Sequence, residues 1–148
     1  MRYFPAALSR TESDALYERI RLGWEQNGFD LWAVERREDT SFIGFIGLSV
    51  ARFDAHFTPC VEIGWRLVRS AWGCGFATEG AGGALEFGFS RLGLGEIVAF
   101  TAATNLRSRR VMERLGMRRD PRDDFEHPLV PEGHPLRPHV LHRLRRPT

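Results

Sequence analysis

Residues 70–80, with the sequence SAWGCGFATEG, hold the pattern in this chain that is best suited to chemistry. Gly73 and Gly75 stand two positions apart, so their backbone amides are not covered by side chains. If the Ala- and Leu-rich run that follows is a helix, its first N–H groups are unpaired and its start is partially positive. Residues 72–80 therefore predict an anion site for a phosphate or pyrophosphate. The alternative is a turn that only lets a helix dock.

Two other phosphate-binding turns do not fit this segment. A P-loop needs Gly-Lys followed by Ser or Thr, and all the basic residues of this chain except its His are Arg. A dinucleotide-binding turn needs Gly or Ala three residues after the second Gly, where Thr78 stands. The lack of Lys, which we attribute to compositional bias, also excludes Schiff-base catalysis.

Cysteine and histidine chemistry is weakly supported. Cys74 lies where a helix N-terminus would lower the pKa of its thiol, but no nearby residue is a suitable His partner. His127, His134 and His139 stand seven and five residues apart, which fits no standard metal-ligand spacing. We therefore expect neither a cysteine nucleophile nor a bound metal.

Hydrophobic periodicity indicates the elements that position the turn. A capped amphipathic helix is expected over Ser9–Trp24, ended by Asn27-Gly28. Further strands are expected at Leu31–Glu35, Phe42–Phe53, Val61–Val68, Ile97–Thr101 and Val140–Leu144, and helices at Ala77–Leu92 and Asn105–Leu115, the latter capped by Gly116. This order predicts an α/β fold (an α+β mixed sheet): an antiparallel meander followed by a β-α-β-α unit, with helices on both faces.

Length and charge bound the class of protein. The 148 residues suit one domain, 1–148, and a formal charge of +2 gives only a weak overall field. The longest near-apolar run, Phe42–Ala51, is about half of a membrane span, and no secretory leader is visible. Cys60 and Cys74 are too few for a disulfide framework, so we expect a cytoplasmic protein.

Residues 62–117 strongly resemble the GNAT superfamily of acetyltransferases, most closely its RimJ/RimL-like branch. The family motif (Gln/Arg)-x-x-Gly-x-(Gly/Ala) is matched by Trp72-Gly73-Cys74-Gly75-Phe76-Ala77, with Trp72 in place of Gln or Arg. The second element, Asn-x-x-Ser before a helix ending in Leu-Gly-Met, is matched by Asn105, Ser108 and Leu115-Gly116-Met117. The segment matching Met1–Pro5 normally follows a first strand and helix, so the domain is expected to be shortened at its N-terminus.

The resemblance implies transfer of acetyl from acetyl-CoA to an amine by direct attack, without an acyl-enzyme. It implies that the pyrophosphate contacts the amides of the turn and that the pantetheine arm pairs with β-strand backbone and with Asn105. The implied cofactor-binding residues are Leu67, Val68, Gly73, Cys74, Gly75, Phe76, Ala77, Thr78, Asn105 and Ser108. Arg107, Arg109 and Arg110 are candidates for the 3′-phosphate of CoA, although a solvated helix face is favoured.

An amine must lose a proton to attack, and the departing thiolate must gain one. Glu62 is the candidate base, acting through water, and the alternative is a solvent-facing strand carboxylate. Many family members use a Tyr in the second helix as the acid, but Tyr3 and Tyr17 lie far upstream. Ser108 is the nearest substitute, unless it only contacts the cofactor or caps the helix. In the Pro-rich segment after Met117, Phe125 and His127 are expected to contact the acceptor.

Two other kinds of protein remain as alternatives. A non-catalytic acyl-CoA-binding or regulatory module of the same fold is favoured by the shortened N-terminus and the absent Tyr. A nucleic-acid binder is disfavoured, because the Arg residues are interspersed with carboxylates and no RNA-binding motif is present. We expect an amine acceptor, either a protein N-terminus or a small amine, no nucleic-acid or membrane partner, and a monomer or homodimer.

Overall fold

The first helix, α1, spans Arg10–Asn27 in the computed structural model, which describes residues 9–148. Ser9 caps this helix, since its Oγ accepts a hydrogen bond of 3.1 Å from the Glu12 N–H. Gly28 ends it in the left-handed conformation, at φ 78°. The predicted helix is confirmed, and it extends to the Asn27-Gly28 stop signal.

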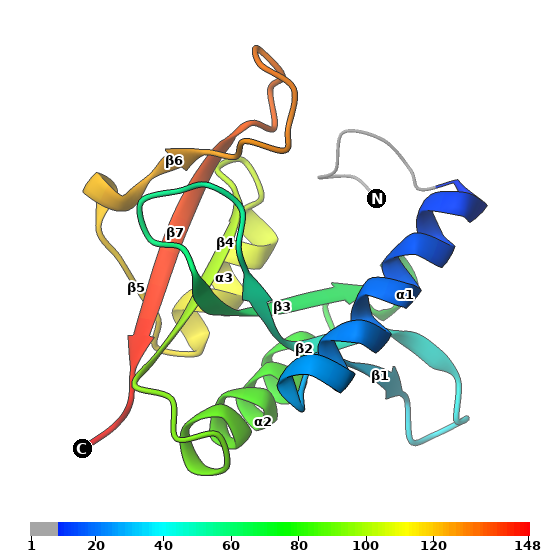
Figure 1. Ribbon diagram of the computed structural model, residues 1–148. Helices are drawn as coiled ribbons and strands as arrows, with labels where there is room; N and C mark the ends of the chain where they lie inside the picture. Colours follow the sequence, from blue (N-terminus) through cyan, green and yellow to red (C-terminus); the bar gives the residue numbers. More distant parts are fainter. Residues whose placement is uncertain (1–8) are drawn as a thin grey trace.

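The predicted meander is also confirmed (Figure 1). Strands β1 (Leu31–Glu35), β2 (Phe42–Ala51) and β3 (Cys60–Leu67) pair in antiparallel fashion in sequence order. Strand β2 ends two residues earlier than expected, and β3 begins and ends one residue earlier. These shifts are within the usual uncertainty of element ends.

After β3 the chain makes a short 3-10 turn, η1 (Arg69–Ala71), and enters helix α2 (Phe76–Ser90). Strand β4 (Glu96–Ala102) then returns parallel to β3, with Glu62 opposite Val98. Helix α2 can lie close to the sheet because residue 88 is a glycine. A Cβ added to Gly88 would stand only 2.6 Å from Ile97 Cδ1. The expected β-α-β unit is therefore present.

Helix α3 (Leu106–Arg114) begins one residue after the expected Asn105, which is its N-cap. Its C-cap is Leu115, one position before the expected cap Gly116, which is left-handed at φ 82°. The Pro-rich segment after Met117, for which no element was expected before Val140, contains two short strands, β5 (Arg118–Arg119) and β6 (Phe125–Glu126), and the 3-10 turn η2 (Pro121–Asp123). Both strands pair with the last strand, β7 (Pro138–Arg145).

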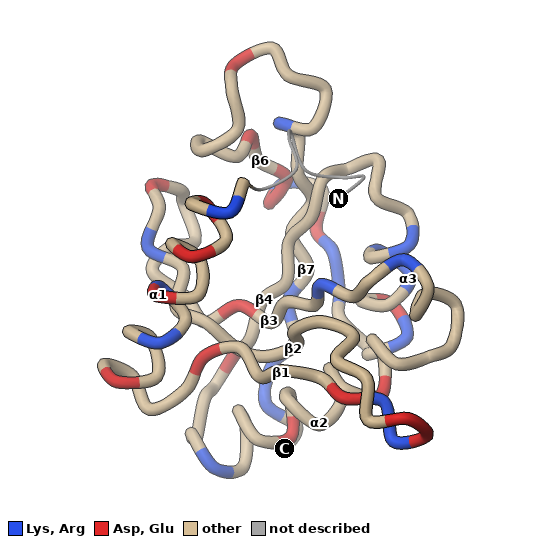
Figure 2. Tube along the Cα trace, turned by 90° about the vertical axis from the view of Figure 1, so that its right-hand side faces the viewer, with Lys and Arg blue, Asp and Glu red and all other residues tan. Residues whose placement is uncertain are grey.

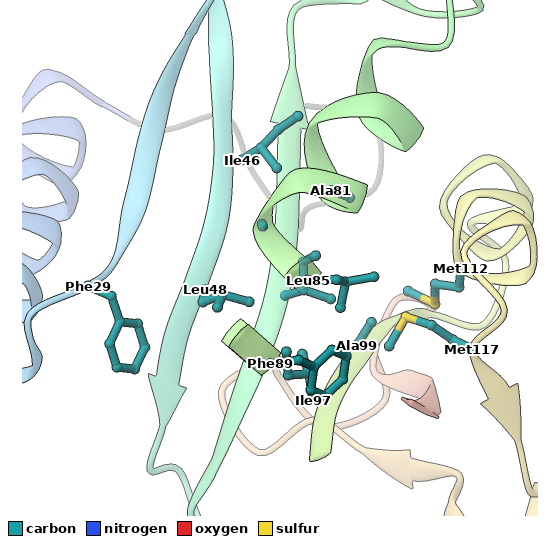
Figure 3. Packing of buried hydrophobic residues seen from close by; sticks show 12 residues of the cluster. Phe29, Ile46, Leu48, Ala81, Leu85, Phe89, Ile97, Ala99, Met112 and Met117 are labelled. Carbon is teal, nitrogen blue, oxygen red and sulfur yellow. The ribbon is translucent and has the colours of Figure 1, made fainter. Parts of the chain in front are cut away.

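Within residues 9–148 the strands form one mixed seven-stranded sheet, in the order β1-β2-β3-β4-β7-β5, with β6 also on β7. Helices α1 and α3 lie on opposite sides of β3, β4 and β7 (Figure 2). The core lies between α2 and one face of the sheet (Figure 3). Its members from α2 and the strands include Ala81, Leu85, Phe89, Ile46, Leu48, Ile63, Ile97 and Ala99.

Side chains alternate between the two faces of a sheet. Ile63, Ile97 and Ala99 point toward α2 and the core, and we call this side the α2 face. Glu62 and Val98, which are opposite each other, point to the other side, the α1 face. Arg19 of α1 acts electrostatically on Glu62, in keeping with this placement.

Charges of both signs are interspersed along most of the chain (Figure 2). No helix in the described part of the chain is long and apolar enough to span a membrane. The expected N-terminal shortening concerns the segment around Met1–Pro5, which lies outside the described residues.

Candidate functional site

A cleft of about 700 Å³ opens beside the end of β3, where that strand and β4 separate, although no described residue of β4 lines it. The two strands are in register at Glu62 and Val98 and then diverge toward their C-terminal ends (Figure 1). The walls come from the start of β2, the end of β3, the turn before α2 with the first turn of that helix, and one side of α3 as far as its last residue. The divergence leaves the C-terminal half of β3 without a neighbouring strand on its β4 side.

The glycine turn forms one end of this cleft. Gly73 and Gly75 are left-handed, at φ 76° and φ 80°, and a Cβ at either would have no protein atom within 4 Å. Glycine is therefore favoured at both positions by the left-handed backbone, and not by a lack of space for a side chain. Gly75 is the N-cap of α2, so the start of that 15-residue helix faces the turn. Gly73, Gly75, Phe76, Ala77 and Thr78 line the cleft, whereas Cys74 is exposed and does not.

Five arginines line the cleft, and none of its described lining residues is acidic. They are Arg66, Arg69, Arg107, Arg110 and Arg114. The guanidinium of Arg107 lies 4.6 Å from the ring centre of Trp72, and that of Arg69 lies 5.9 Å from it. Trp72 is itself held by a 2.9 Å hydrogen bond from its Nε1 to the Leu67 carbonyl. The cleft is therefore strongly cationic, with Trp72 placing two of its charges.

Asn105 and Ser108 meet Trp65 at the start of α3. Asn105 Oδ1 accepts from the Ser108 N–H at 3.2 Å, and Asn105 Nδ2 donates to Thr101 Oγ1 and Ser108 Oγ, both at 3.1 Å. Trp65 Nε1 donates to the same Ser108 Oγ at 3.2 Å. Because both donors can only donate, the two acceptor positions of Ser108 Oγ are filled, and its own hydroxyl proton must point elsewhere.

Some of the backbone groups at the end of β3 already form hydrogen bonds within the protein. The Val68 N–H donates to the Ile43 carbonyl at 2.8 Å, on the β2 side. Because backbone groups alternate along an antiparallel ladder, those of Leu67 face the opposite, open side. The Leu67 carbonyl accepts from Trp72, which leaves the Leu67 N–H as the group directed at the cleft. The predicted strand-like contact at Leu67 and Val68 stays a prediction, now centred on Leu67.

Glu62 lies where β3 and β4 are still paired, just before the two strands separate, and it does not line the cleft. It is partly buried on the α1 face, and its Oε1 accepts from Ser49 Oγ at 3.4 Å. Burial raises the pKa of the Glu62 carboxyl to about 8, and the negative charge of Asp30 adds to this. Asp30 is buried beside α1, and burial raises its pKa as well. Glu62 is thus no ordinary solvent-facing carboxylate, and a group that titrates near neutrality suits proton transfer.

Phe125 and His127 lie away from this cleft, in an aromatic cluster on the α1 face. Phe125 on β6 packs 5.8 Å, centre to centre, from Phe100 on β4, and His127 packs 4.4 Å from Phe53. Burial lowers the pKa of His127 to about 4, so its ring is neutral at physiological pH. Within the described residues, His, Cys, Asp and Glu form no group of three or more that could bind a metal.

Sequence reasoning missed Trp65 and most of the arginines. Arg107, Arg110 and Arg114 recur at spacings of three and four, which places them on one side of α3, and this signal was available. Arg109 points elsewhere and donates to the Ala103 carbonyl at 2.9 Å. The contact between Trp65 and Ser108 joins residues 43 positions apart and left no local signal.

Comparisons with known proteins bear on the family and the fold of the chain. Residues 1–118 match the family model described as an acetyltransferase (GNAT) domain. The uncharacterized protein YkkB of Bacillus subtilis is 31% identical over 109 residues, which cover 70% of this chain and 62% of that protein. The uncharacterized N-acetyltransferase YoaA of the same bacterium is 33% identical over 89 residues, 60% of this chain and 49% of that protein. An acetyltransferase structure from Agrobacterium tumefaciens has a TM-score of 0.72 at 25% identity, over 96% of this chain and 74% of that one. The chain thus spans less than two thirds of those two curated relatives.

Proposed function

The chain belongs to the GNAT acetyltransferase family, and from that premise we propose that it transfers acetyl from acetyl-CoA to a primary amine by direct attack. The observation that carries the proposal is the cationic cleft beside the glycine turn. The CoA part of the donor is polyanionic, with a pyrophosphate and a 3′-phosphate. Arginines and uncovered amides are the groups that bind such anions, and carboxylates would repel them.

The turn and the arginines divide the phosphates between them in this proposal. The pyrophosphate contacts the amides of residues 73–78, at the positive end of α2. The 3′-phosphate is held from α3 by Arg107 and Arg110, which line the cleft, whereas Arg109 does not. For Arg107 and Arg110 the proposal thus takes the binding role over the solvated helix face, because both line the cleft.

The pantetheine arm occupies the gap between β3 and β4. Beyond Glu62 and Val98 the two strands are too far apart to pair, so an extended chain can lie along β3 as an added strand. The Leu67 N–H is directed at this gap. Asn105 Oδ1 keeps one acceptor position after bonding the Ser108 N–H, and that position suits an amide N–H of the arm.

The acceptor approaches from the α1 face, where Glu62 lies. Its amine nitrogen attacks the thioester carbonyl carbon, and the excess proton passes through a water to the Glu62 carboxylate. When the tetrahedral carbon collapses, the C–S bond breaks and the electron pair stays on sulfur. Ser108, on the α2 face beside the gap, passes its hydroxyl proton to that thiolate and takes a replacement proton from solvent water, while Glu62 returns its proton to solvent.

Ser108→Ala should lower kcat while leaving acetyl-CoA binding nearly unchanged. A neutral hydrogen bond contributes about 0.5–1.5 kcal/mol, so we expect a loss of up to about tenfold. Ser108→Thr keeps the hydroxyl and should keep most of kcat. Thiol release under saturating substrates is the measurement, with the exposed Ser13→Ala on α1 as control. Equal losses in Ser108→Ala and Ser108→Thr would remove Ser108 from the role of acid.

A non-catalytic acyl-CoA-binding module is the second candidate. Two observations favour it: Glu62 lies outside the cleft lining, and α3 contains no Tyr. Thiol release from acetyl-CoA, with mass analysis of the amine product, separates the two. The acetyltransferase should release thiol in proportion to acetylated product. If the chain binds acetyl-CoA but releases no thiol with peptide N-termini, polyamines or small amines, it is the non-catalytic module instead.

The remaining aspects of function are proposals on the same basis. We assign the chain to the RimJ/RimL-like branch because of the Trp72 turn and the Asn105 and Ser108 element. The acceptor is then a protein N-terminus or a small amine, and the enzyme acts in the cytoplasm as a monomer or homodimer, without nucleic-acid or membrane partners. Size-exclusion chromatography with light scattering tests the oligomeric state.

A further inference from the structure

Six aromatic rings from distant parts of the chain meet on the α1 face, and we call them the aromatic patch. They are Phe53, Phe57, Phe100, Phe125, His127 and His139. Their closest ring centres are 4.4 Å apart, between Phe53 and His127, and 4.8 Å apart, between Phe57 and Phe125. Each ring is partly exposed, so the patch is a surface that solvent still reaches.

The patch lies beside the proposed site of acetyl transfer. Val98 is opposite Glu62, and Phe100 follows two residues later on the same face of β4. Two residues span roughly 6.6 Å along a strand, in the direction in which β3 and β4 diverge. His139 on β7 is opposite Ala102 on β4, so it extends the patch from β4 onto β7. An amine reaching the gap from the α1 face therefore has Glu62 on one side and aromatic rings on the other.

The charges on the β6 side of the patch disfavour a polycationic acceptor. All four acidic side chains of residues 120–126 pair with arginines, at 2.5–3.6 Å. Asp123, for example, accepts from Arg143 Nε at 3.0 Å and is also 3.2 Å from His56. His127 and His139 are both neutral at pH 7, because burial lowers the pKa of each ring. Apolar rings with neutral neighbours are complementary to another apolar ring.

We propose that the acceptor amine carries an aromatic or bulky apolar group, which packs on the aromatic patch while the amine nitrogen faces Glu62. This inference rests on the proposed acetyl transfer and adds the class of acceptor to it. The ring anchors the acceptor. The donor thioester and Ser108 then lie on the side of the sheet that faces α3, and the acceptor and Glu62 lie on the side that faces α1.

The test compares two amino-acid amides, one with an aromatic ring and one without, and adds a polycationic amine. Phenylalanine amide and alanine amide present the same α-amine, and spermidine is the polycation. With acetyl-CoA saturating, kcat/KM for phenylalanine amide should exceed that for alanine amide by at least about tenfold, which corresponds to about 1.4 kcal/mol. Equal or faster transfer to alanine amide or spermidine would overturn the inference.

Variants locate the preference on the patch. Phe125→Leu should reduce the ratio of the two kcat/KM values by about fivefold, mainly through KM for phenylalanine amide, because an edge-on contact between rings is lost. Phe57→Leu is an independent second variant, in case one of them fails to fold. Tyr17→Leu removes a ring that is 63% exposed on α1, outside the patch, and should leave the ratio unchanged. An unchanged ratio in both patch variants would contradict the proposal.

Failure of the acceptor inference can be told apart from failure of the proposed function. Thermal unfolding with and without acetyl-CoA is measured on the same samples. Stabilisation by acetyl-CoA without any preference for the ring overturns the acceptor inference alone. No stabilisation at millimolar acetyl-CoA contradicts the proposed function, and the acceptor inference with it.

Discussion

Glu62→Gln should lower kcat by about 10²-fold or more, because general base catalysis typically contributes about 10²–10⁴-fold. Affinity for acetyl-CoA should stay within about twofold of wild type, since Glu62 lies outside the cleft lining. The amide keeps the size of the carboxyl group and can still contact Ser49. Steady-state kinetics together with calorimetric titration of acetyl-CoA measure both quantities.

The pH dependence of the rate follows from the environment of Glu62. Burial raises the pKa of this carboxyl to about 8, with Asp30 adding to the shift and Ser49 and Arg19 opposing it. The base is therefore mostly protonated at pH 7. When rates are referred to the concentration of neutral amine, kcat/KM should rise through about pH 8 in the wild type. In Glu62→Gln this rise should disappear.

The same carboxyl links stability to pH. Its folded-state pKa is above its unfolded value of about 4.5, so the native state keeps a proton that the unfolded chain loses. The free energy of unfolding should fall as pH rises from about 4.5 through about 8. Glu62→Gln removes this loss and should be more stable than wild type at pH 9. Glu35→Gln, at an exposed carboxylate of β1, is the control for both rate and stability. Wild-type turnover and pH profile in Glu62→Gln would rule Glu62 out as the base.

Gly75→Ala should weaken acetyl-CoA binding by about 10- to 100-fold. An Ala at φ 80° is strained, and its Cβ projects into open space where the pyrophosphate is expected to meet the amides. Hydrogen bonds to charged groups contribute about 1.5–3 kcal/mol each, and losing one or more gives a change of that size. The measurement is the Kd of acetyl-CoA by titration calorimetry.

Gly28→Ala is a matched control for this variant. Gly28 is also left-handed, at φ 78°, also has no protein atom within 4 Å of its Cβ position, and caps α1 away from the cleft. Both variants should lose about 1–2 kcal/mol of stability from backbone strain. Only Gly75→Ala should lose cofactor affinity. Equal Kd values in the two variants would show that the turn does not bind the pyrophosphate.

Local patterns predicted the elements that have local causes. Ser9 and Asn105 carry capping side chains, and their helices begin where those residues indicated. The alternation and length of residues 31–68 were enough for the meander. Strands β5 and β6 have two residues each, too few for a period to show, and they exist because β7 offers them backbone partners.

The candidate site divides in the same way. The glycine turn is continuous in sequence and could be found from its letters. The cationic cleft is built from β3, η1 and α3, so its charge becomes evident only once these elements meet. The raised pKa of Glu62 depends on burial by the fold, and the aromatic patch joins residues 53–139 through strand register. Apart from the spacing of Arg107, Arg110 and Arg114 along α3, none of these features has a local signature in the sequence.

The central claim is that the cleft between β3 and α3 binds acetyl-CoA through its turn and arginines. Titration calorimetry of acetyl-CoA into the wild-type chain, at low and at high salt, tests it most directly. We predict one site per chain with a micromolar Kd, about −8 kcal/mol, that weakens as salt screens the arginines. No binding heat at millimolar acetyl-CoA, at either salt concentration, would contradict the claim.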